Sequence, residues 1–80
     1  MTAKELQVKI QDTKSFLNRE IVRIRTNTPG CSLSFREIGV RMDMIHEAER
    51  VGVRNLGESQ NRKLTKMIEE VEKIKDISLN

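Results

Sequence analysis

The segment from Ser34 to Leu56 constrains the fold most, because it is apolar on two opposite sides of one helix. At about 100° per residue, its apolar side chains fall on two stripes. The first stripe contains Phe35, Ile38, Met42, Ile45 and Leu56, and the second contains Val40, Met44, Ala48 and Val51. A helix with two apolar faces must be covered on both of them. The sequence therefore predicts a middle helix that packs between two others.

The segments before and after this one each predict an amphipathic helix with one main apolar stripe. In residues 2–26 the stripe contains Ala3, Leu6, Ile10, Leu17, Ile21 and Ile24. In residues 60–77 it contains Leu64, Met67, Ile68, Val71 and Ile74. Both sets recur at the three- and four-residue spacing of one helix face. These are the two helices that we expect to cover the middle one.

Turn residues and caps set the expected boundaries. Pro29 and Gly30 end the first helix, because proline restricts the residue before it to extended backbone and glycine admits a tight turn. A serine, Ser32 or Ser34, begins the second helix, and Ser34 has capping-box spacing with Glu37. Gly52 either admits a close backbone approach or ends a helix, and the polar residues 57–61 mark a clearer break. We expect helices over about 2–26, 34–56 and 60–77 in one domain, 1–80.

The expected fold class is all-α, either a three-helix bundle or a helical hairpin that assembles as a coiled coil. In the second form the middle and last helices run on as one rod, which must associate with other chains. The chain has 80 residues, two phenylalanines and neither tyrosine nor tryptophan, so its core is thin. A single cysteine, Cys31, cannot form an intrachain disulfide. Association is the expected remedy, and a reducing intracellular setting, cytoplasmic or nuclear, is expected.

Catalytic and cofactor chemistry finds little support in the residues. His46 is the only histidine, whereas a transition-metal site needs several His or Cys ligands at fixed spacing. Cys31 precedes a helix start, where a thiol can become reactive, but no nucleophile motif accompanies it. Since there is no glycine-rich phosphate loop either, we expect no enzyme, no cofactor and no metal. No apolar run of 18 residues or export signal occurs, so no transmembrane segment is expected.

The best-supported function is a small helical protein–protein interaction or assembly module, either an adaptor or an oligomerisation unit. It would dock on a helical partner or on a second copy of itself. Methionine side chains are flexible and adapt to a partner surface. The predicted interface residues are Val40, Met42, Met44, Val51 and Met67. A competing interpretation places the same side chains in the core of the chain itself.

The alternative function is nucleic-acid binding through a basic patch. The chain has a net charge of +3 and a pI near 9.4. Residues 50–66 contain Glu58 as their only acid, and the predicted phosphate contacts are Arg50, Arg54, Arg62, Lys63 and Lys66. A plain solvated basic face is the competing interpretation. SLSFREIGVRMDM also resembles the opening of a helix-turn-helix, with Gly39 as its small residue, but Asp43 stands where a turn glycine is usual.

A second resemblance covers about residues 42–78. MDMIHEAERVGVRNL, followed by Gly57, resembles the first half of a SNARE helix of the synaptosome-associated (SNAP) type. The spacing from Gln60 through Leu64, Met67, Val71 and Ile74 is similar to the layers that follow the central glutamine in that family. The resemblance implies a four-helix bundle with Gln60 in its polar central layer and a role in membrane fusion. Between Gly52 and Gln60 the chain is two residues shorter than the family pattern.

Overall fold

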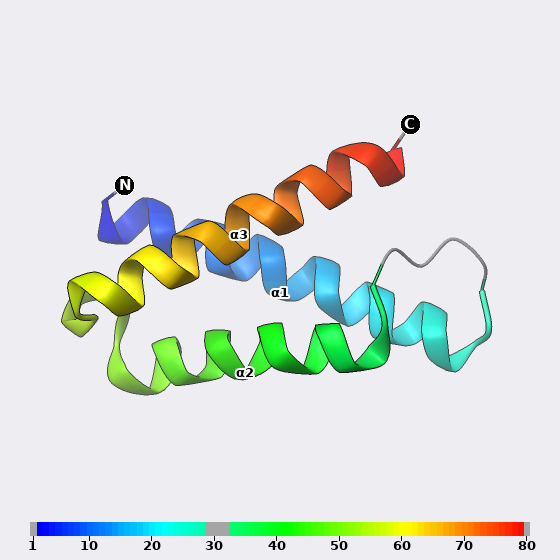
Figure 1. The fold of residues 1–80 in the computed structure, drawn as a ribbon, viewed down its shortest axis with the longest axis horizontal. Helices are drawn as coiled ribbons and strands as arrows, with labels where there is room; N and C mark the ends of the chain where they lie inside the picture. Colours follow the sequence, from blue (N-terminus) through cyan, green and yellow to red (C-terminus); the bar gives the residue numbers. More distant parts are fainter. Residues whose placement is uncertain (1, 29–32, 80) are drawn as a thin grey trace.

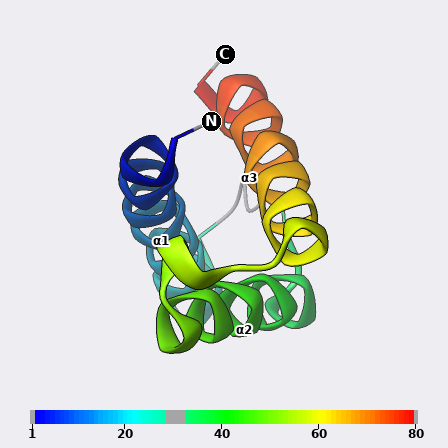
Figure 2. The same cartoon turned by 90° about the vertical axis from the view of Figure 1, so that its left-hand side faces the viewer.

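A computed structural model describes residues 2–28 and 33–79, and these form three α-helices without a β-strand. The elements are α1 (Ala3–Arg25), α2 (Phe35–Val51), the short 3-10 helix η1 (Val53–Asn55) and α3 (Glu58–Leu79). α2 runs antiparallel to both α1 and α3 (Figure 1). Viewed from its left-hand side, the molecule has α1 and α3 on either side above α2 (Figure 2). The predicted all-α three-helix bundle is confirmed.

Side-chain caps begin the first two helices where the sequence predicts. The Thr2 hydroxyl accepts a hydrogen bond from the Glu5 backbone N–H at 3.2 Å. The Ser34 hydroxyl accepts from the Glu37 N–H at 3.1 Å, and the Glu37 carboxylate accepts from the Ser34 N–H at 3.5 Å. These bonds satisfy N–H groups that the first turn of a helix leaves without partners. The predicted turn residues 29–32, Cys31 among them, lie outside the described part of the chain.

The middle helix ends at Val51 and not at Leu56 as predicted. Gly52 has φ +96°, a backbone conformation that glycine adopts without the steric cost that other residues carry. Its N–H donates to the Ala48 carbonyl at 2.9 Å, and its own carbonyl accepts from the Asn55 N–H at 2.8 Å. The chain therefore leaves α2 at Gly52 and turns through η1. α3 begins at Glu58, two residues before the predicted position, and folds back along α2, so the continuous rod does not form.

The core lies where the three helices face one another. All three α-helices contribute side chains to it: Leu6, Ile10, Phe16 and Leu17 from α1, Ile38, Ile45 and Ala48 from α2, and Leu64, Met67, Ile68 and Val71 from α3. Leu33, which lies just before α2, also belongs to the core. Phe16 is the one aromatic member, and the Lys75 ammonium lies 5.9 Å from its ring centroid. Two polar side chains are also buried: Thr13, which the sequence places on the apolar stripe of the first helix at its one missing step, and Glu20, which the sequence did not predict.

The two apolar stripes of the middle helix are only partly covered. Ile38 and Ile45 on the first stripe and Ala48 on the second are buried. At the start of the helix, however, Phe35 is 56% exposed and Val40 is 54% exposed. α1 and α3 thus cover the side of α2 that lies between its two apolar stripes. The far edge of each stripe, where Phe35 and Val40 lie, stays exposed. The second stripe in particular keeps apolar surface that the chain itself leaves in contact with water.

Among the residues that the structure describes, one ion pair links each pair of helices. Lys9 binds Glu72 at 2.9 Å and joins α1 to α3, and the hydrogen bond and charge of this carboxylate raise the pKa of Lys9. Lys14 binds Glu49 at 3.1 Å and joins α1 to α2. Arg41 lies 3.9 Å from Glu70 and joins α2 to α3. Exposed pairs add little stability, so the apolar core holds the bundle and these pairs favour its register.

We expect Ile45→Ala to lower the free energy of unfolding by about 2–5 kcal/mol, because it opens a cavity at a fully buried position. Urea unfolding followed by circular dichroism measures this. Val22→Ala is the matched control, since Val22 is 58% exposed, and it should change stability by less than about 0.5 kcal/mol. Equal effects of the two substitutions would contradict the described core.

Candidate functional site

An apolar groove lies between α2 and α3 and is the strongest candidate for a binding site. Its volume is about 300 Å³. Apolar side chains from both helices and the linker form its floor: Met44, Ala48, Leu56 and Leu64. Polar side chains form its edges, with Asp43 and Glu47 on α2 and Gln60 and Lys63 on α3. This combination of an apolar floor and polar edges is typical of surfaces that receive an amphipathic helix.

Local sequence explains how the groove forms. Met44 and Ala48 are four residues apart and therefore lie on one side of α2. Ala48 has no atoms beyond Cβ, so the floor is low at this point. The turn at Gly52 places Leu56 beside α2. A continuous helix would instead have placed Leu56 further along the helix axis, away from Met44. At the start of α3, the Gln60 side-chain carbonyl accepts from the Gly57 N–H at 3.2 Å, which positions Gln60 at the groove edge.

The structure brings some of the predicted interface residues together and separates others. Met44 lines the groove, and Val40 extends its apolar surface by one turn, since the two are four residues apart on α2. Val51 is half-buried near the end of the same stripe. Met42 is half-buried against the core on the first stripe. Met67 is 5% exposed and packs inside the core, as the competing interpretation of these side chains would have it.

Sequence reasoning missed two of the apolar residues in the groove. The sequence prediction continues the middle helix through Gly52, and this puts Leu56 on the opposite stripe. Leu64 was expected in the stripe of the last helix, but not at an edge shared with α2. Gly52 is the signal that could have placed both leucines in the groove. The sequence leaves two alternatives for this glycine, and one of them is the end of a helix. If the middle helix ends there, the chain can turn, and the last helix then runs back along the middle one and buries Leu64.

The groove edges carry one unpaired charge of each sign. Among the described residues, the ion pairs include neither Asp43 on the α2 edge nor Lys63 on the α3 edge. Glu47, in contrast, binds the Arg50 guanidinium, with 3.1 Å between Arg50 Nε and Glu47 Oε2. Asp43 and Lys63 are both exposed. They are therefore available to oppositely charged groups of a molecule that enters the groove.

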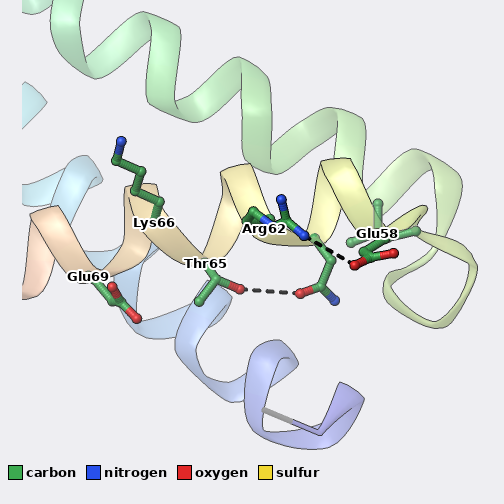
Figure 3. Close-up of a pocket in the computed structure, with 7 residues that line it drawn as sticks. Glu58, Arg62, Thr65, Lys66 and Glu69 are labelled. Carbon is green, nitrogen blue, oxygen red and sulfur yellow. Dashed lines mark hydrogen bonds and ion pairs between the residues drawn. The ribbon is translucent and has the colours of Figure 1, made fainter.

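The predicted phosphate contacts do not form one positive surface. Arg62 binds Glu58 at 3.1 Å, and Arg50 is engaged by Glu47. Arg62 and Lys66 line a second hollow, of about 690 Å³, together with two acids, Glu58 and Glu69 (Figure 3). The remaining lining residues of that hollow are Leu56, Asn61 and Thr65. Two acids and two bases thus lie together on this side of α3, which weakens attraction to phosphate.

The other two basic residues of the predicted patch lie apart from this hollow. Arg54 belongs to η1 and is exposed, and Lys63 stands at the edge of the apolar groove. Two of the five cations, Arg50 and Arg62, are paired with acids in exposed ion pairs. The five cations therefore do not form one continuous positive surface, whereas the apolar side chains of the groove lie together.

The remaining sequence hypotheses concern isolated residues. α2 runs unbroken through Asp43, so the turn that the helix-turn-helix resemblance requires at this position does not form. His46 is exposed, and residues 2–28 and 33–79 contain no group of three or more His, Cys, Asp or Glu side chains arranged to hold a metal ion. None of the helices formed by these residues has the length and apolar character needed to cross a membrane.

We expect Arg50→Gln to raise the pKa of Glu47. The Arg50 hydrogen bond is the largest of the effects that lower this pKa, and the Arg50 charge lowers it further. The ion pair is formed above the ordinary pKa of a glutamate and is lost as the pH falls through the lowered value. A pH titration of the side-chain carboxyl carbons by NMR measures the change. An unchanged Glu47 pKa would mean that Arg50 is free to bind phosphate.

Comparisons with known proteins do not assign the groove to a family. No protein-family model matches the chain, and neither a curated protein nor a solved structure gives a significant match. The SNARE resemblance stays a prediction, and Gln60, its implied central-layer residue, is exposed at the groove edge. The function is therefore inferred from the groove and the charges beside it.

Proposed function

We propose that the chain is a small helical protein–protein interaction module that receives an amphipathic helix in the α2–α3 groove. The observation that carries this proposal is the apolar surface left open along one side of α2. Val40 is 54% exposed and Met44 is half-buried, although the helix behind them packs into a closed core. A single exposed apolar residue needs no explanation. Here two of them adjoin a hollow whose floor is apolar.

The energetics of docking favour an apolar occupant. Removing apolar surface from water stabilises a complex by roughly 25 cal/mol per Å². Val40, Met44 and Leu56 keep surface that a partner would cover. The thioether of Met44 is flexible and fits partners of different shape. A helix with apolar residues three and four positions apart matches such a groove.

The charged edges supply orientation. A helix in the groove lies between Asp43 on one side and Lys63 on the other. The side that faces α2 should therefore carry Lys or Arg, and the side that faces α3 should carry Asp or Glu. The reverse orientation would place like charges together, which costs affinity. An intracellular setting, cytoplasmic or nuclear, belongs to this proposal because the single Cys31 needs no oxidising compartment.

We expect synthetic amphipathic helical peptides with this charge pattern to shift backbone NMR signals of α2, η1 and the first turns of α3. Met44→Glu should abolish these shifts, because it places a carboxylate on the apolar floor. Val22→Glu is the control: it adds the same charge at an exposed apolar position of α1 and should leave the shifts unchanged. Peptides with the charge pattern reversed should bind more weakly.

The proposal fails if none of these peptides perturbs the groove and the chain also remains a single copy in solution. Equal binding by the Met44→Glu variant would contradict it as well. In that case the contact lies elsewhere on the molecule. Circular dichroism of each variant establishes that its helices are intact before binding is measured.

Nucleic-acid binding through Arg50, Arg54, Arg62, Lys63 and Lys66 is the alternative, and salt separates the two functions. Three free cations on a DNA duplex give a salt exponent of roughly −2.7, so affinity would fall about 40-fold between 50 and 200 mM salt. We expect peptide binding in the groove to change far less over this range, because apolar burial does not depend on counterions. Fluorescence anisotropy of a labelled peptide and a labelled 20-base-pair duplex measures both. Tight, salt-sensitive binding of the duplex would favour the alternative.

A further inference from the structure

We infer that a second copy of this chain packs over the α2–α3 groove, with its own groove facing the first and a two-fold axis running along the groove between them. The inference rests on the proposed function and names its partner. Its basis is that the open surface is complementary to itself in charge, in helix direction and in apolar character. A symmetric dimer requires this kind of self-complementary patch.

The charges select the direction of the axis. Asp43 and Lys63 stand on opposite edges of the groove, and neither takes part in the ion pairs of the described residues. A two-fold axis along the groove brings each edge of one copy against the opposite edge of the other. Asp43 then meets the Lys63 of the second copy, and the contact occurs twice. An axis across the groove would instead oppose Asp43 to Asp43 and Lys63 to Lys63.

Helix directions agree with the same axis. α2 and α3 are antiparallel within one copy (Figure 1), and rotation about an axis parallel to both preserves their directions. α2 of each copy therefore faces α3 of the other in antiparallel orientation. The four helices form a bundle in which every neighbouring pair is antiparallel, as in many four-helix bundles. This arrangement also places opposite ends of the helix dipoles beside each other.

Apolar contacts complete the surface. Val40 and Met44 on α2 keep apolar surface in contact with water, and α3 of the second copy, which faces α2 in this arrangement, would cover it. The second apolar stripe of α2, which α3 of its own chain covers only in part, then gains a second helix. The core described above contains one aromatic side chain, and this added burial would strengthen a thin domain.

The test is molar mass by sedimentation equilibrium, from about 5 µM to about 1 mM, a range suited to a weak or moderate dimer. The mass of the unmodified chain should rise from 9.3 kDa toward twice that value. Asp43→Lys and Lys63→Asp should each weaken the dimer at least about tenfold, because each places like charges together. The double variant, Asp43→Lys with Lys63→Asp, should recover the original dissociation constant, since both contacts are restored with reversed sign.

Two controls carry the same charge changes away from the groove. Asp12→Lys and Lys4→Asp alter exposed positions of α1 and should leave the dissociation constant unchanged. Circular dichroism confirms that each variant keeps its helices. The recovery by the double variant also excludes a loss caused by misfolding of either single variant.

Two results would overturn the inference. If the chain keeps a mass of 9.3 kDa throughout, no second copy enters the groove, and peptide binding decides separately whether the proposed docking function holds. If the chain dimerises but the double variant does not recover, the two-fold contact is not the one described. Recovery in the double variant, together with silent controls, supports it.

Discussion

Packing of one side of α2 against both α1 and α3 is the interaction on which the rest of the structure depends. Ile45 is fully buried, and Ile38 nearly so, where α2 meets α1 and α3. Without this contact α1 and α3 would have only each other to pack against, and helices in proteins gain most of their stability from packing. The ion pairs between helices are exposed or half-exposed and adjust the register of this packing. They do not replace it.

Gly52 determines how the last helix returns onto that packing and where the groove forms. Its positive φ ends α2 and lets the chain turn within a few residues, so that α3 returns along the same helix. The return places Leu56 and Leu64 beside Met44 and creates the groove. A longer α2 would have separated these side chains along a rod. The turn thus determines which apolar residues enter the core and which remain at a groove that a partner can reach.

The charge distribution distinguishes the two classes of function. A positive surplus along residues 50–66 suggested contact with phosphates, but Glu47 and Glu58 engage two of those cations. Lys63 belongs to the groove, opposite Asp43. Paired and mixed charges do not give the uniform positive surface on which binding to a nucleic-acid backbone depends.

The sequence by itself determined the helices and their caps. Periodic apolar residues and the Ser34–Glu37 capping box depend on neighbours within a few positions, so they could be predicted without the fold. The tertiary structure decided that Gly52 ends the middle helix and does not lie inside it, and this places Leu56 in the groove. It also decided that Met67 is core, that Val40 is exposed, and which arginines meet carboxylates. Those outcomes depend on how whole helices cross and pack, and local periodicity carries no information about that.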